Sequence, residues 1–188
     1  MFSGNPSSYQ AVVGSHTLSM IEPNQQTISL KRIIRHESYE SRISKDHDIA
    51  IVELSNSAKV GNTVLPVCFP DKSPRVEDYC VTVGWAKIGG YSTINRLQQL
   101  IAPPISKATC NQVNWYYNGV HDNMICAGHQ YPVASCQPDT GGPLLCLYKG
   151  LWRVSGVHSW GEGCFRKQKP AVFTDIYLYK TWINTHVA

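Results

Sequence analysis

Residues 135–146 read SCQPDTGGPLLC and hold the side chains best suited to chemistry. The hydroxyl of Thr140 follows the carboxylate of Asp139 and stands before a Gly-Gly-Pro turn. A second carboxylate, Asp48, opens the apolar run DIAIVEL far away in the sequence. A side-chain hydroxyl becomes a nucleophile when a base lies within hydrogen-bond reach and a third group orients that base. Thr140, Asp139 and Asp48 are therefore residue types that nucleophilic catalysis could use.

Apolar runs of strand length recur along the chain. The strands that they predict must position the hydroxyl and carboxylate side chains named above. The runs are rich in Val, Ile, Leu and aromatic residues, and clusters of turn-forming residues separate them. LYKGLWRV is typical of a hairpin that turns at Lys149-Gly150. The pattern predicts an all-β protein of short antiparallel strands. The runs are QAVVG, TISLKRIIRH, DIAIVEL, YCVTVGW, PLLCLYKGLWRVSGVHSW and PAVFTDI.

Helical signals are scarce, and two segments carry them. SKATCNQVN predicts a short helix with Ser106 as its N-cap. In the C-terminal segment, Ile176, Tyr179 and Ile183 recur at helical spacing, with Thr174 or Asp175 as the cap. The C-terminal segment therefore predicts a helix whose apolar face packs on the core.

The charge pattern argues against nucleic-acid binding, and the apolar pattern argues against a membrane span. The 188 residues carry a net charge of +4, and no run of five or six like charges occurs. Nucleic-acid binding is therefore not indicated. No apolar run approaches the length of a transmembrane helix, and MFSGNPSSYQ lacks the features of a signal peptide.

Seven cysteines indicate an oxidising compartment. None forms a C-x-x-C pair, so the ligand spacing of a zinc site is absent, and the sequence predicts no metal and no cofactor. A disulfide framework is the better interpretation, and its odd count leaves one thiol without a partner in this chain. The cysteines are Cys68, Cys80, Cys110, Cys126, Cys136, Cys146 and Cys164.

Six ordered motifs resemble the chymotrypsin-like (trypsin-fold) serine proteases, from about Tyr9 to the end of the chain. The family pattern C-x-G-D-S-G-G-P-L-x-C matches CQPDTGGPLLC. The other matches, in chain order around it, are DHDIAIVEL, VTVGWAKIGG, NMICAGH, SGVHSWGEGC and KPAVFTDI. So many motifs in the right order make chance agreement very small, whereas one alone is weak.

The resemblance implies an all-β fold, a trypsin-like double antiparallel β-barrel with an incomplete first barrel and a C-terminal helix. Residues 1–188 are then a single trypsin-like serine protease domain, truncated at the N-terminus. Residues 9–75 are expected as the remnant of the first barrel, 76–173 mainly as the second barrel, and 174–187 as the helix.

The resemblance also assigns the cysteines. It pairs Cys80 with Cys146, Cys110 with Cys126, and Cys136 with Cys164. Cys68 stands where some members tether an upstream segment, so it is expected to be unpaired here.

The catalytic triad of the family is degenerate in this sequence. Asp48 matches the catalytic aspartate, and Thr140 stands in place of the nucleophilic serine. The catalytic histidine belongs in an A-A-H-C context ahead of the aspartate, and no such stretch exists in this chain. His47 adjoins Asp48 but is expected to point to the opposite face. His158 could face the substrate pocket, yet it would lack a partnering carboxylate.

The oxyanion site implied by the resemblance is also defective. It consists of the backbone N–H groups at Pro138 and Thr140, and proline has no N–H. Losing one such donor costs about 10²–10³ in rate. The resemblance places the base of the substrate pocket at Ala134, where trypsin-like members carry aspartate. Its strand holds Ser159 and Trp160, and its walls hold Gly161 and Ala171. The pocket is therefore expected to be apolar.

The residues leave three hypotheses open. The first is a catalytically inactive homologue, a pseudoprotease that binds a protein or peptide ligand or has a regulatory role. The second is a serine endopeptidase, in a longer form that supplies the missing histidine. The third is a chain without independent function. Extracellular localisation is expected from the resemblance and the cysteines.

Overall fold

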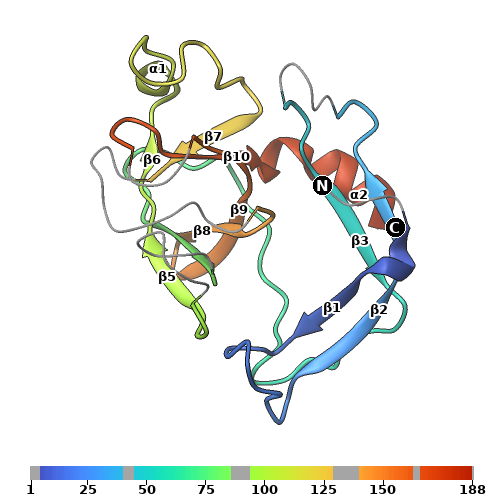
Figure 1. Ribbon diagram of the computed structural model, residues 1–188. Helices are drawn as coiled ribbons and strands as arrows, with labels where there is room; N and C mark the ends of the chain where they lie inside the picture. Colours follow the sequence, from blue (N-terminus) through green and yellow to red (C-terminus); the bar gives the residue numbers. More distant parts are fainter. Residues whose placement is uncertain (1–4, 40–44, 86–93, 129–139, 163–165, 188) are drawn as a thin grey trace.

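The computed structural model describes residues 5–39, 45–85, 94–128, 140–162 and 166–187, which form two β-sheets and a C-terminal helix (Figure 1). Within these ranges the smaller sheet contains β1 (Gln10–Val13), β2 (Gln26–Arg35) and β3 (Ala50–Leu54). The larger sheet contains β4 (Cys80–Gly84), β5 (Gln98–Ile101), β6 (Pro104–Ile105), β7 (Met124–Ala127), β8 (Pro143–Tyr148), β9 (Leu151–Trp160) and β10 (Ala171–Asp175). The helices are η1 (Pro6–Ser8), α1 (Lys107–Cys110), η2 (Ile176–Tyr179) and α2 (Lys180–Val187).

The larger sheet curls on itself. Its strand order is β5-β4-β8-β9-β10-β7-β6, yet the edge strands β5 and β6 are joined in the chain by residues 102–103 alone. The two edges must therefore approach each other, which bends the sheet into a half-barrel. Leu144 and Phe173 fill its interior and are fully buried. The predicted all-β architecture with a C-terminal helix is confirmed.

The smaller sheet is antiparallel and centred on β2. Within the described residues β1 pairs with Gln26–Ser29 and β3 pairs with Leu30–Arg35. All residues of β3 are only partly buried. A sheet with a partly buried strand of this kind does not enclose a hydrophobic core of its own. Its stability therefore depends on packing against other parts of the molecule.

The C-terminal helix supplies part of that contact, because it packs against both sheets. Its buried residues are Ile176, Tyr179 and Ile183, the three expected from their helical spacing. Around them lie Ile49 and Ile51 from the β3 segment and Val154 and Val157 from β9. Figure 1 shows η2 leaving β10 and α2 lying along the smaller sheet.

Local signals in the sequence locate several turns and caps correctly. Lys149 and Gly150 adopt φ of 50° and 77° and join β8 to β9, as the two-residue hairpin requires. Ser106 caps α1 by accepting from the Thr109 backbone N–H at 3.1 Å. Asp175 caps η2, and burial raises the pKa of its carboxyl.

The sequence pattern did not predict three of the strands, β5, β6 and β7. β5 has the sequence QQLI and exposes most of its side chains, so it shows no apolar run. β6 contains only Pro104–Ile105, and β7 contains Met124–Ala127. Such short strands form because the neighbouring strands position them, and their own residues carry little signal.

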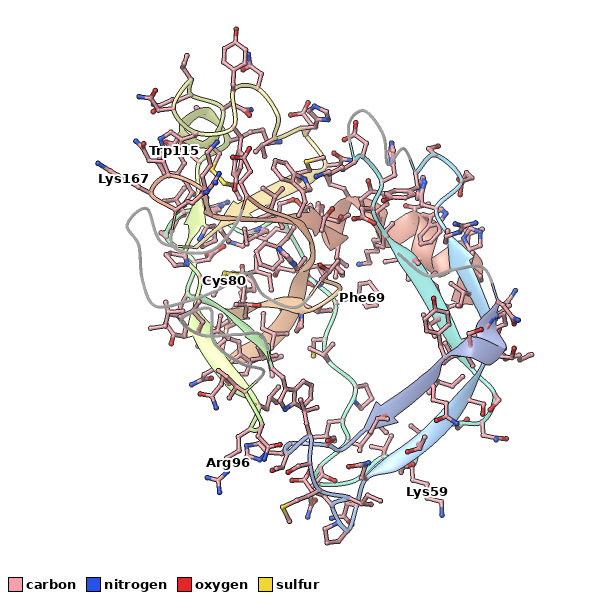
Figure 2. All side chains as sticks on the ribbon, in the orientation of Figure 1. Lys59, Phe69, Cys80, Arg96, Trp115 and Lys167 are labelled. Atoms are coloured by element: carbon pink, nitrogen blue, oxygen red, sulfur yellow. A yellow bond between two sulfur atoms is a disulfide. The ribbon has the colours of Figure 1, made fainter. Side chains whose placement is uncertain are left out.

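Two of the three disulfides implied by the resemblance are present. Cys80–Cys146 joins directly opposed residues of β4 and β8, and Cys80 lies inside the larger sheet (Figure 2). Cys110–Cys126 joins α1 to β7. Cys68 is exposed and free, as expected. Cys136 and Cys164 lie outside the described residues.

We predict that Gly156→Ala destabilises the larger sheet. A Cβ at this position would lie 2.9 Å from the Cβ of Phe173 and 3.3 Å from the Cβ of Leu144. Both neighbours are fully buried, so neither can move aside easily. Overpacking of this kind lowers the free energy of unfolding by about 1–3 kcal/mol, which urea denaturation measures.

Gly61→Ala is the matched control, because a Cβ at Gly61 meets no atom within 4 Å. It should change the free energy of unfolding by less than about 0.5 kcal/mol. Equal losses in the two variants would contradict the close packing at Gly156.

Candidate active site

Asp48 lies where the two sheets meet. Its carboxylate Oδ2 accepts a hydrogen bond of 2.6 Å from the hydroxyl of Ser159, in β9. Its backbone carbonyl accepts a second hydrogen bond, of 2.8 Å, from the hydroxyl of Thr174, in β10. Asp48 comes two residues before β3, so these bonds attach the smaller sheet to the larger one.

A β-bulge directs Ser159 towards Asp48. In the pairing of β9 with β10, Trp160 lies opposite Val172, and His158 lies opposite Phe173. Ser159 is therefore the extra residue between two consecutive partners on β10. A bulge of this kind bends the strand and changes the direction of a side chain, which brings the Ser159 hydroxyl to the carboxylate.

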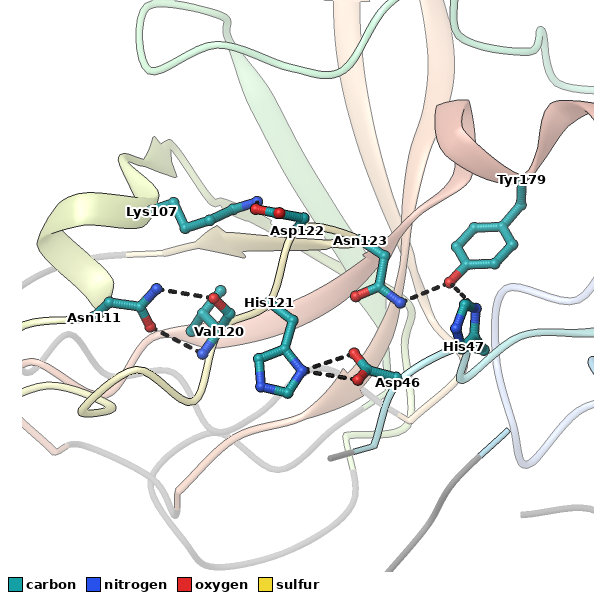
Figure 3. Close-up of polar contacts among 9 residues, drawn as sticks. All are labelled: Asp46, His47, Lys107, Asn111, Val120, His121, Asp122, Asn123 and Tyr179. Atoms are coloured by element: carbon teal, nitrogen blue, oxygen red, sulfur yellow. Dashed lines mark hydrogen bonds and ion pairs between the residues drawn. The ribbon is translucent and has the colours of Figure 1, made fainter. Parts of the chain in front are cut away.

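The two residues that precede Asp48 contact other side chains (Figure 3). Asp46 Oδ1 lies 2.8 Å from Nδ1 of His121. Nδ1 of His47 lies 3.0 Å from the Tyr179 hydroxyl. His47 therefore turns away from Asp48, as expected. The cause is a left-handed backbone at His47, with φ of 55°, rather than the simple alternation of a strand.

Thr140 is exposed and begins a turn that is hydrogen-bonded to β9. The Gly141 N–H donates to the His158 carbonyl at 2.9 Å, and the His158 N–H donates to the Gly142 carbonyl at 2.8 Å. His158 directly precedes Ser159, so Thr140 lies near the end of β9 that carries the contact to Asp48. Pro138 lies outside the described residues, and the defective oxyanion site stays a prediction.

The His158 ring is not accessible as a substitute base. Its side chain is 2% exposed and packs edge-to-face on Phe173, with the ring centroids 5.4 Å apart. The sequence suggested that this ring could face a pocket, but the structure places it in the core. Within the described ranges the Asp48 carboxylate accepts a hydrogen bond from Ser159 and from no imidazole.

The residues expected to line the pocket lie on neighbouring strands, and the pocket itself stays a prediction. Ser159, Trp160 and Gly161 are partly buried at the end of β9, and Ala171 begins the neighbouring strand β10. Ala134, the expected base of the pocket, lies outside the described residues.

An aromatic pair packs together at the end of β9. The Trp160 and Tyr116 rings meet edge-to-face, with centroids 4.8 Å apart. The Tyr116 hydroxyl donates to the Pro170 carbonyl. Burial raises the pKa of Tyr116 well above its ordinary value, so this donor keeps its proton.

Sequence reasoning missed the contact between Ser159 and Asp48. Ser159 was expected only as a pocket residue. The signal for its hydrogen bond to Asp48 is a polar side chain at the end of a long apolar run.

The described residues contain neither a candidate metal site nor a membrane-spanning helix. No group of three or more His, Cys, Asp or Glu side chains there could hold a metal ion. No helix in those ranges has the length and apolar character needed to cross a membrane.

Comparison with known proteins identifies the family. The family model described as Trypsin matches residues 2–183. The chain belongs to the trypsin family. Its curled sheet, its smaller sheet and its C-terminal helix are consistent with the trypsin fold.

Curated relatives agree with this assignment. The chain is 35% identical to Serine protease 1 of Homo sapiens, over 95% of this chain and 71% of that protein. It is 34% identical to Trypsin-1 of Astacus astacus, over 97% of this chain and 77% of that protein. It is 33% identical to Chymotrypsin-C of Rattus norvegicus, over 95% of this chain and 69% of that protein.

We predict that Ser159 and Asp48 are energetically coupled. Ser159→Ala removes the donor to a partly buried carboxylate and should lower the free energy of unfolding by about 1–3 kcal/mol. In a double-mutant cycle with Asp48→Ala, the two losses should fall short of additivity by about 0.5–3 kcal/mol. Urea denaturation of the four proteins gives this coupling.

Ser57→Ala serves as the control, since Ser57 is exposed in the loop after β3. It should leave the free energy of unfolding almost unchanged. Strictly additive losses for Ser159→Ala and Asp48→Ala would show that the two side chains do not interact in solution.

Proposed function

We propose that this member of the trypsin family binds a peptide or protein ligand along the surface of β9 without hydrolysing it. The observation that carries the proposal is the environment of Asp48. Its carboxylate is bonded to Ser159, and no imidazole of the described residues contacts it. Without that imidazole, the carboxylate has no base to orient.

The loss of the base decides the chemistry. In a Ser-His-Asp site the imidazole removes the proton of the attacking hydroxyl, and the buried carboxylate keeps the imidazole in position. Among the described residues no imidazole is hydrogen-bonded to the Thr140 hydroxyl, so no base there is positioned to remove its proton. The additional methyl group of Thr140 also restricts χ1 and crowds the attack path. We infer that peptide hydrolysis at Thr140 is negligible.

Pro138 would weaken the site further. As a proline it cannot donate a backbone N–H to a developing oxyanion. Loss of one such donor costs about 10²–10³ in rate. This defect acts on the transition state and leaves ground-state binding of a ligand intact, which fits a protein that binds without cleaving.

The ligand-binding surface has what binding requires. Ser159 and Trp160 keep fixed positions through the Asp48 hydrogen bond and the packing on Tyr116. A rigid wall loses little entropy when a ligand binds. The two disulfides of the described residues support an extracellular setting, because such bonds persist in oxidising compartments.

A second candidate is an endopeptidase formed by a longer polypeptide. The chain covers 69–77% of the length of the three relatives, so those proteins contain residues with no counterpart here. An imidazole supplied by additional residues could bind the free side of the Asp48 carboxylate. It would restore the base but would leave Thr140 and Pro138 unchanged.

Activity measurements on the 188-residue chain test the first candidate. We expect the 188-residue chain to show no labelling by a fluorophosphonate probe and no turnover of a mixed peptide-amide library. Thr140→Ala should be indistinguishable from the unmodified chain in both assays. Thr140→Ser should also stay inactive, because the limiting defect is the missing base.

A protease of the same family with an intact triad provides the positive control. Labelling or turnover by the unmodified chain that disappears in Thr140→Ala would overturn the proposal. Activity gained by Thr140→Ser would show instead that a base is present and that only the nucleophile was deficient.

A further inference from the structure

An exposed lysine covers the indole of Trp160. The Lys45 Nζ lies 5.1 Å from the centroid of the Trp160 ring. Lys45 comes three residues before Asp48, and Trp160 directly follows Ser159. The Ser159–Asp48 hydrogen bond therefore joins the two segments that carry this cation and this ring. Lys45 belongs to the same surface on which the proposed ligand lies.

The Lys45 ammonium has no anionic partner among the described residues. No carboxylate in those ranges comes within 4.0 Å of its nitrogen, and the neighbouring Asp46 is occupied by His121. Lys169 offers a direct comparison, since it lies over the ring of Tyr116 at 4.7 Å. Its ammonium is 3.1 Å from the carboxylate of Glu162. Two lysines thus flank the Trp160–Tyr116 pair, and within the described residues a carboxylate pairs with Lys169 but not with Lys45.

The turn that carries Lys45 is held in place on both sides. Lys45 and His47 adopt φ of 54° and 55°, a region that residues other than glycine seldom occupy. Such backbone persists where the surroundings impose it. Here Asp46 is fixed by His121, and His47 is fixed by Tyr179, as Figure 3 shows. The position of Lys45 is therefore set before a ligand arrives.

We propose that this surface selects peptides with an acidic side chain, Asp or Glu, beside Trp160. The carboxylate would pair with Lys45 through a charge-assisted hydrogen bond, and the aliphatic part of the side chain would lie on the indole. An apolar side chain could reach the indole only by displacing Lys45 and ending its cation–π contact. A basic side chain would be repelled. The inference rests on the proposed function, because it names the ligand class of the same site.

Selection from a peptide library tests this specificity. The immobilised 188-residue chain is incubated with acetylated, amidated peptides randomised at every position, and the retained peptides are sequenced. We expect Asp and Glu to be enriched about three- to tenfold at one position, as for a partly exposed ion pair. Lys45→Ala should abolish that enrichment, and Lys45→Glu should replace it with enrichment of Lys and Arg.

Lys149→Ala is the matched control. Lys149 also lies over an aromatic ring, 5.3 Å from the centroid of Tyr148, but in the β8–β9 hairpin. It should leave the acidic preference unchanged. Lys45 is exposed, so its variants should melt like the unmodified chain. Retained peptides with no acidic preference, or with a preference that survives Lys45→Ala, would overturn this inference and leave the proposed function standing. Retention of no peptide would overturn both.

Discussion

The two hydrogen bonds at Asp48 are the contact on which the arrangement of the molecule depends. Ser159 donates to its side chain and Thr174 to its backbone, so adjacent strands of the larger sheet hold the segment that leads into β3 of the smaller sheet. The smaller sheet needs this attachment, because every residue of β3 is only partly buried. The C-terminal helix completes the attachment by packing against both sheets. Folding of the smaller sheet is thus coupled to the larger one.

The same contact determines what the surface of β9 can do. The bulge that brings Ser159 to Asp48 also places Trp160 against Tyr116. The turn before Asp48 then brings Lys45 over the indole. In an active protease an imidazole contacts the corresponding carboxylate. Among the described residues, no imidazole contacts the carboxylate of Asp48. On the proposed function, such a protein positions a ligand without activating a nucleophile. Family membership and catalysis are therefore separate questions for this chain, because fold does not imply function.

The sequence predicted the parts of the fold that have strong local causes. Long apolar runs identified β2, β3, β8 and β9, the Lys149-Gly150 turn joined two of them, and Ser106 capped α1. β5 was not predicted because QQLI is mostly polar and forms a strand at the edge of the sheet by pairing with β4. The disulfides Cys80–Cys146 and Cys110–Cys126 followed from the family resemblance, since spacing alone does not fix connectivity.

The candidate site was predictable to a smaller extent. Motifs singled out Asp48 and Ser159 separately, but the contact between them depends on a one-residue bulge in the pairing of β9 with β10. The cation over Trp160 depends on left-handed backbone at Lys45, a residue type that gives no hint of it. Both features arise from tertiary packing, and no local pattern encodes them.

The fate of a bound peptide tests the central claim most directly. The tightest-binding peptide from a random library is incubated with the chain for many hours, and the mass of the ligand recovered from the complex is measured. The account predicts that the peptide remains bound and is recovered at its intact mass. Recovery of two fragments, produced by the unmodified chain but not by Thr140→Ala, would contradict it.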